Sequence, residues 1–229
     1  LIRYHYDHRE DMFDRHSYQK GGRILHMLRN LVGDDAFFAS LKLYLNNRAF
    51  KTAEVHDLRM AFEEVSGQDL NWFFNQWFLD KGHPILEVNW EHRGDSLLLN
   101  VSQVQPLSHP TFKFPVDVDV YFGGKTERKK IWVTKRKERF VFKGLGGAEV
   151  LNFDADKVLL MELNQTLTPE EAFVLFKGSD NYRTKLEAML QVSADTSLTA
   201  WELLLLASKD KFDSFRKLSV YFSTNLDYA

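Results

Sequence analysis

The chain has 229 residues, a formal net charge of −2 at pH 7 and no cysteine. This length accommodates one to three domains with a sizeable core. The absence of Cys excludes disulfide scaffolds, thiolate zinc fingers, iron–sulfur clusters and cysteine catalysis. The longest apolar run, Trp201 to Ala207 interrupted by Glu202, is far shorter than the ~20 residues of a membrane helix, so we expect no membrane span.

The first part of the chain, from about residue 17 to residue 82, has helical spacing of its apolar residues. Ser17 is expected to be the N-cap of a first helix that ends at Gly33, and two aspartates open a second helix. A third helix is expected to end at Gly67, and a fourth to stop at Gly82-His83-Pro84. Four large apolar residues of the second helix are expected to face the core: Phe37, Phe38, Leu41 and Leu45.

From Ile85 the period of the apolar residues changes from near 3.6 to 2, which indicates β-strands. The clearest strand spans residues 112–120, where Phe and Val alternate with mostly polar residues. Glycine turns separate further short runs, which predict strands near 86–90, 97–101, 130–134, 139–143 and 158–161. Six or seven short strands within about eighty residues are typical of a small antiparallel β-sandwich.

Helical spacing returns after Thr168-Pro169-Glu170-Glu171, a favourable N-cap with proline at the first helical position. The pattern predicts four helices, near residues 169–177, 181–192, 197–208 and 210–222. Such helices resemble the stacked hairpins of a helical solenoid.

A basic stretch, Lys125 to Arg139, has two interpretations. Interleaved Trp132 and Phe140 would suit binding to nucleic acid. Glu127 and Glu138 dilute the positive charge, however, and lysines also protect the edge of a β-hairpin against strand addition. We favour the hairpin and expect no nucleic-acid partner.

The sequence contains few residues in a pattern that could bind a metal ion. The eight histidines are scattered, and the close pair is His5 and His8, which would lie one turn apart if the segment were helical. The chain contains no His-Glu-x-x-His motif. Packing or solvation is the favoured interpretation of the pair, and we predict no metal or cofactor site in this chain.

The stretch Ser17 to Leu25 is the most informative part of the sequence. Gly21 and Gly22 in the first turns of a helix cost roughly 1 kcal/mol each relative to alanine, which is easier to understand if something approaches the backbone. Tyr18 is expected to be half-buried with a free hydroxyl, which can donate a hydrogen bond to a developing oxyanion. Alternatively, Tyr18 is a core aromatic and the glycines allow close helix packing.

Residues 18–29, Tyr-Gln-Lys-Gly-Gly-Arg-Ile-Leu-His-Met-Leu-Arg, resemble the Tyr-x-Lys-Gly helix of the M1 (gluzincin) zinc aminopeptidases, the aminopeptidase N family. The resemblance is dense over residues 16–90, and beyond residue 90 only the order and type of the elements match. Further matching segments are Gly33-Asp34, Asp57-Leu58, Phe62-Glu63, Ser66-Gly67, Asp69-Leu70, Trp72 to Trp77 and Gly82 to Leu86.

This resemblance implies a zinc enzyme that hydrolyses the first peptide bond of peptide substrates. In the family, a zinc ion held by His-Glu-x-x-His and a later Glu activates water, a Gly-x-Met-Glu-Asn loop holds the free amine, and a Tyr stabilises the tetrahedral intermediate. Tyr18 occupies the place of that Tyr. The zinc motif, the third ligand and the amine-binding loop precede this Tyr in the family and do not occur in the chain.

We therefore expect a C-terminal fragment that begins after the zinc-binding motif, is inactive and zinc-free alone, and works with the missing N-terminal part of the same protein. The implied fold is multidomain. Residues 1–84 would form the helical end of a thermolysin-like catalytic domain, 85–165 the β-sandwich, and 166–229 the start of a solenoid-like helical domain. The alternative is a non-catalytic binding or scaffold protein built on the same architecture.

Overall fold

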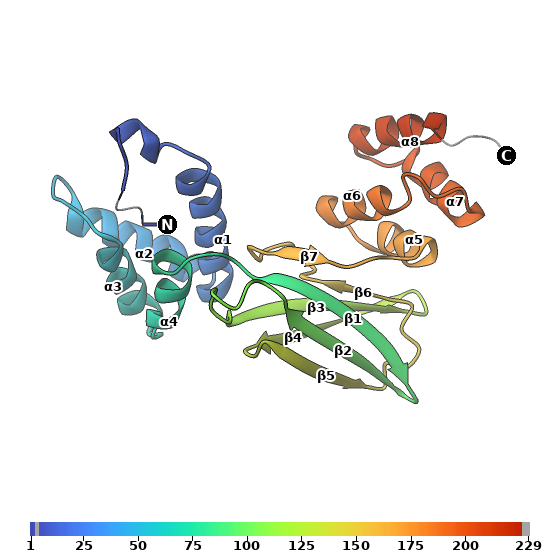
Figure 1. The fold of residues 1–229 in the computed structure, drawn as a ribbon, viewed down its shortest axis with the longest axis horizontal. Helices are drawn as coiled ribbons and strands as arrows, with labels where there is room; N and C mark the ends of the chain where they lie inside the picture. Colours follow the sequence, from blue (N-terminus) through green and yellow to red (C-terminus); the bar gives the residue numbers. More distant parts are fainter. Residues whose placement is uncertain (3–4, 226–229) are drawn as a thin grey trace.

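The computed structural model describes residues 1–2 and 5–225. Its elements form three groups along the chain, which are helices α1–α4, strands β1–β7 and helices α5–α8. In Figure 1 the strands lie in the middle, and the two helical groups lie at opposite ends of them.

The first group is helical, as predicted. It comprises a 3₁₀ turn (Arg9–Met12), a π turn (His16–Lys20), α1 (Gly21–Val32), α2 (Asp34–Arg48), α3 (Val55–Ser66) and α4 (Asn71–Phe74), which runs into a second π turn (Asn75–Leu79). Ser17 is not an N-cap, because the helical backbone already begins at His16. Gly67 ends α3 with a left-handed φ of 68°, as expected of a C-terminal glycine.

Helix α2 buries less of its apolar surface than the sequence suggests. Phe37 is buried and its ring lies 5.5 Å from that of Phe62 on α3, with an edge-to-face geometry. Phe38 and Leu45 are exposed, so the expectation that they face inward was wrong. The helix carries apolar residues on more than one side, and the described neighbours cover the side that holds Phe37.

The strands form two stacked sheets. Their bounds are β1 (Ile85–Arg93), β2 (Ser96–Gln103), β3 (Phe114–Phe122), β4 (Lys125–Val133), β5 (Lys137–Lys143), β6 (Val150–Phe153) and β7 (Glu162–Asn164). One sheet has the order β5-β2-β1-β7 and the other β4-β3-β6. The sandwich is antiparallel as predicted, with one correction: β7 pairs in parallel with β1.

The predicted strand at residues 158–161 was wrong, because this segment is a loop. The carboxylate of Asp154 accepts the backbone N–H groups of Val158 and Leu159, at 3.0 and 2.9 Å. The N–H of Leu160 lies 3.3 Å from Sδ of Met27 on α1. These contacts occupy the backbone N–H groups that a strand would donate to a neighbouring strand.

The basic stretch does not form a hairpin, which corrects that prediction. Strands β4 and β5 are edge strands of different sheets, so the predicted edge position holds. Arg128 donates to both Asp119 and Asp156 at 2.7–3.0 Å. Lys129 pairs with Glu127, and Lys130 lies 3.7 Å from Asp117, so these three cations are paired within the sandwich.

The last group has four helices within the described residues, close to the predicted positions. They are α5 (Pro169–Gly178), α6 (Tyr182–Gln191), α7 (Leu198–Ala207) and α8 (Asp213–Asn225). Thr168 caps α5 by a reciprocal capping box with Glu171. Among the helices that the structure describes, none is long and apolar enough to cross a membrane.

Two hydrophobic cores divide the molecule. Helices α1–α4 and the interior of the sandwich share one core, which includes Leu28, Trp77 and Phe114. Helices α5–α8 form the second core, to which the sandwich contributes Tyr121 and Val150. The first helical group and the sandwich are therefore packed as a continuous body.

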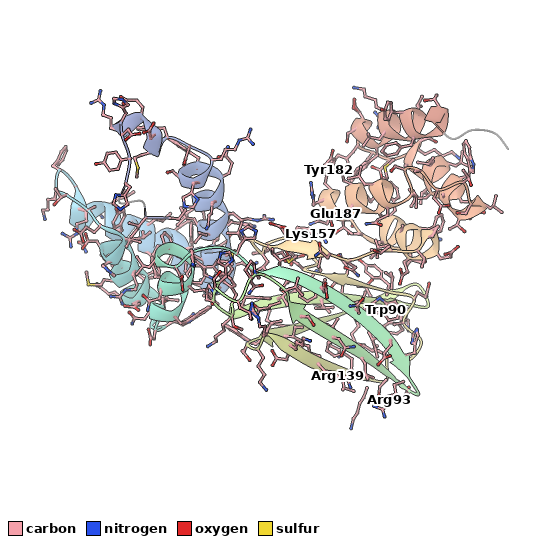
Figure 2. All side chains as sticks on the ribbon, in the orientation of Figure 1. Trp90, Arg93, Arg139, Lys157, Tyr182 and Glu187 are labelled. Atoms are coloured by element: carbon pink, nitrogen blue, oxygen red, sulfur yellow. The ribbon has the colours of Figure 1, made fainter. Side chains whose placement is uncertain are left out.

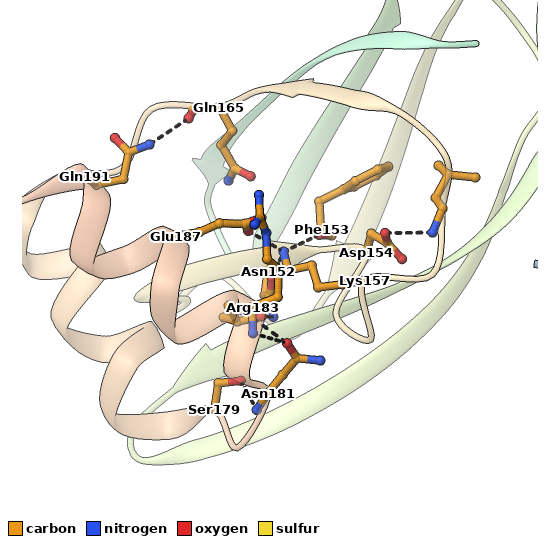
Figure 3. Close-up of polar contacts among 12 residues, drawn as sticks. Asn152, Phe153, Asp154, Lys157, Gln165, Ser179, Asn181, Arg183, Glu187 and Gln191 are labelled. Carbon is orange, nitrogen blue, oxygen red and sulfur yellow. Dashed lines mark hydrogen bonds and ion pairs between the residues drawn. The ribbon is translucent and has the colours of Figure 1, made fainter. Parts of the chain in front are cut away.

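A polar seam joins the sandwich to α6. Figure 2 shows Lys157 and Glu187 facing each other there, with Nζ and Oε2 3.0 Å apart. Figure 3 shows that the same ammonium also contacts Oδ1 of Asn152 and the carbonyl of Phe153, at 3.1 and 3.4 Å. Nδ2 of Asn152 lies 3.3 Å from Oγ1 of Thr184, and both side chains are buried.

Candidate functional site

The candidate site is the π turn His16–Lys20, which carries Tyr18 and precedes α1. The backbone N–H groups of Gln19 and Lys20 both donate to the carbonyl of Arg15, at 3.0 and 3.1 Å. Oδ1 of Asp14 accepts the N–H of Ser17 at 2.8 Å and so satisfies a free donor at the start of the turn. Single π turns within helices are frequent at functional sites.

Tyr18 projects outward from this turn. Its residue surface is 61% exposed, so the expectation of a half-buried ring was wrong, and so was the alternative of a core aromatic. The ring lies 6.2 Å from that of Phe13, tilted by 30°. Among residues 1–2 and 5–225, no group hydrogen-bonds to the Tyr18 hydroxyl, which leaves the O–H available to a ligand.

Lys20 lies on the same turn but reaches toward the body of the protein. Its Nζ donates to the carbonyl of Gly82 at 3.2 Å, in a partly buried position. Burial lowers the pKa of this ammonium. The sequence pattern gave no sign of this contact, because its partners are 62 residues apart.

The two glycines after the turn are not required by close packing. An added Cβ at Gly21 would lie at an ordinary distance, 3.8 Å, from Cδ1 of Leu1. At Gly22 it would meet no atom of the described residues within 4 Å. Neither the approach of a group to the backbone nor tight helix packing is therefore seen in this part of the molecule.

His5 and His8 do not form a helical pair. Both are exposed, and residues 5–8 are not helical. In the part of the chain that the structure describes, no three His, Cys, Asp or Glu side chains lie together as metal ligands would. These residues therefore do not fit a catalytic zinc, which needs three protein ligands and an open position.

The fold as a whole matches that of a solved peptidase. The structure superposes on the crystal structure of Legionella pneumophila aminopeptidase A in complex with aspartic acid with a TM-score of 0.78. The match covers 93% of this chain and 27% of that protein at 17% sequence identity. The chain therefore shares the fold of a part of that protein.

Sequence comparisons find similarity to M1 peptidases, mainly over the first third of the chain. Residues 3–77 match the peptidase family M1 domain. Aminopeptidase M1 of Arabidopsis thaliana is 24% identical over 231 residues, which cover 96% of this chain and 26% of the plant protein. Aminopeptidase N of Lactococcus lactis subsp. lactis is 37% identical over 86 residues, which cover 38% of this chain and 10% of that protein.

These findings confirm that the chain resembles the M1 aminopeptidases. The matched region 3–77 contains the turn that carries Tyr18. The chain spans about a quarter or less of the length of these curated relatives.

Proposed function

We propose that this chain is part of a zinc-dependent metallo-aminopeptidase that removes the N-terminal residue from peptides, and that Tyr18 stabilises the oxyanion of that reaction. The observation that carries the proposal is the exposed Tyr18 hydroxyl, free of partners among the described residues, on a hydrogen-bonded turn inside the M1-matched region. In the proposed organisation, residues 1–84 end the catalytic domain, 85–165 form the sandwich, and 166–229 begin the helical domain.

The proposed chemistry of Tyr18 is hydrogen-bond donation. As the carbonyl oxygen of the scissile bond gains negative charge, the neutral phenol donates its O–H to that oxygen and keeps its own proton. Such a donor is effective when it is fixed before the reaction begins, because no free energy is then spent on reorienting it. The backbone hydrogen bonds of the turn and the Asp14 contact to Ser17 supply this fixation.

Zinc would supply the activation of water in the complete protein. The described residues of this chain offer no ligand set for it, so we propose that the isolated chain is inactive and zinc-free. Stoichiometric zinc in the purified 229-residue chain, or hydrolysis of an aminoacyl reporter by it, would contradict this part of the proposal.

The central test is Tyr18→Phe in the complete protein. Removal of one oxyanion donor lowers kcat by about 10²–10³-fold, and we expect that loss with KM nearly unchanged. Tyr221→Phe is the matched control, because Tyr221 is 62% exposed, like Tyr18, but lies on α8. A complete protein without aminopeptidase activity would instead favour a non-catalytic scaffold protein, and unchanged turnover in Tyr18→Phe would exclude the oxyanion role.

A further inference from the structure

The contact between Lys20 and Gly82 links the turn of Tyr18 to the segment that leads into the sandwich. Nζ of Lys20 lies 3.2 Å from the Gly82 carbonyl oxygen, and the ammonium is partly withdrawn from water. A hydrogen bond from a charged donor is roughly twice as strong as one between neutral groups. This contact is therefore a strong constraint between segments distant in sequence.

The acceptor itself is held in place from several sides. Gly82 has a left-handed φ of 83°, and an added Cβ would lie 3.1 Å from Nδ1 of His109, so the His109 ring packs directly against this residue. Nε2 of the next residue, His83, lies 2.7 Å from Oε1 of Glu162 at the start of β7. Pro84 is buried, and strand β1 follows at once. The Gly82 carbonyl therefore provides a fixed anchor.

The turn places Lys20 and Tyr18 on different sides. Residues two positions apart in a helical backbone project from nearly opposite sides of its axis. Accordingly Lys20 contacts the body of the protein while Tyr18 is exposed. A restraint on the body side of the turn limits its rotation and thus the direction in which the phenol projects.

We propose that Lys20 is a positioning residue for Tyr18: its ammonium fixes the turn His16–Lys20 to the carbonyl of Gly82 and so sets the direction of the Tyr18 hydroxyl. This proposal rests on the proposed function of Tyr18. It assigns Lys20 no contact with substrate, and it predicts an effect on the rate that passes entirely through Tyr18.

The first experiment measures kcat and KM of Lys20→Met in the complete protein. We expect kcat to fall about tenfold with KM unchanged, because a misdirected donor weakens the transition state and not the bound substrate. Lys20→Arg, which keeps a charged donor, should restore most of the rate. Lys51→Met is the matched control, since Nζ of Lys51 also lies 3.2 Å from a backbone carbonyl, that of Asn47, far along the sequence from the turn. Unchanged kcat in Lys20→Met would overturn the proposal.

The second experiment combines Lys20→Met with Tyr18→Phe. If Lys20 acts through Tyr18, the double variant should turn over at the same rate as Tyr18→Phe alone. A further loss equal to that of Lys20→Met alone would show an independent role and overturn the proposal. If Tyr18→Phe itself leaves the rate unchanged, the proposed function has failed.

A third measurement does not depend on activity. It distinguishes a failure of the positioning role of Lys20 from a failure of the proposed function of Tyr18. In the 229-residue chain labelled with ¹³C-tyrosine, Lys20→Met should shift the ring resonances of Tyr18, and Lys51→Met should not. Unaltered Tyr18 resonances in folded Lys20→Met would refute the positioning role, whatever the fate of the proposed function.

Discussion

The same substitution, glycine to alanine, should have opposite effects on stability at Gly178 and at Gly22. Both residues lie within α-helices, Gly178 at the end of α5 and Gly22 at the start of α1. Their surroundings differ. A Cβ at Gly178 would lie 2.7 and 2.9 Å from two ring carbons of Tyr121, whereas at Gly22 it would meet nothing within 4 Å among the described residues.

The structure sets the expected magnitudes. Carbon atoms pack best at roughly 3.5–4.0 Å, so at Gly178 the Tyr121 ring or the end of α5 must move by roughly 1 Å. Such overpacking costs about 1–3 kcal/mol, and the better helix propensity of alanine recovers about 0.5–1 kcal/mol at a helix end. Taking the middle of each range, Gly178→Ala should therefore destabilise the chain by about 1 kcal/mol, and Gly22→Ala should stabilise it by about 0.5–1 kcal/mol.

Urea and thermal unfolding of the 229-residue chain, followed by circular dichroism, would measure both effects. For a protein of this size, 1 kcal/mol corresponds to about 2–4 °C in Tm. In a Tyr121→Leu background the clash is relieved, so Gly178→Ala should become neutral or stabilising there. If Gly178→Ala alone is as stable as the parent, the Tyr121 ring moves aside freely, and the close packing inferred here between α5 and β3 is wrong.

Three other predictions concern charged groups. Lys157→Met should destabilise the chain by about 1–3 kcal/mol in urea unfolding, because it leaves buried acceptors of the seam unpaired. The exposed control Lys217→Met should lower the unfolding free energy by less than about 0.5 kcal/mol. Arg128→Met should lower the unfolding free energy by about 2–3 kcal/mol in the same measurement, because it leaves the buried Asp119 without its partner. The loss should be smaller than that for a fully buried ion pair, because Arg128 is half-exposed. Burial raises the pKa of the Asp154 carboxyl above its value in the unfolded chain, although two backbone N–H groups partly offset this. The stabilising contribution of Asp154 is thus present at low pH and declines as the pH rises above about 4, when the folded protein disfavours its ionised form. Asp154→Asn cannot ionise, so its unfolding free energy should improve relative to the parent as the pH rises above about 4, and a constant difference would contradict the burial effect.

Much of the fold follows from local sequence signals. The capping box at Thr168 and the left-handed glycine at Gly67 mark helix ends that involve only neighbouring residues. The missed strand β6, Val150–Phe153, shows the limit of such signals. All four of its residues are buried, so it lacks the alternation that identifies a strand with one exposed face.

Long-range contacts account for the remaining errors. Residues 158–161 have the apolar character of a strand, but Asp154 and Met27 take their backbone donors. The parallel pairing of β7 with β1 depends on a distant return of the chain, which brings Glu162 beside Ile85. Leu45 has the right spacing for a buried position, yet periodicity does not reveal which side of α2 the neighbouring helices cover.

For the candidate site, the sequence identified Tyr18 by its motif but not the conformation that presents it. The π turn depends on a shared acceptor at Arg15, and the exposure of the ring depends on the direction in which the turn leaves α1. Lys20 belongs to the same motif, yet its partner Gly82 comes close only because α1–α4 and the sandwich fold together.

The division of the molecule into two cores explains why the Lys20 contact can position Tyr18. A restraint positions a side chain only if its anchor is rigid relative to the helix that bears that side chain. The Gly82 anchor meets this condition, because helix α1 and strand β1, which follows Gly82, contribute to one core. The polar seam at Lys157 joins the sandwich to the other core. Loss of the seam contacts should therefore change how the C-terminal helices pack on the sandwich and leave the direction of Tyr18 unaltered. A substitution at Lys20 should change the direction of Tyr18 and leave the packing of the C-terminal helices unaltered.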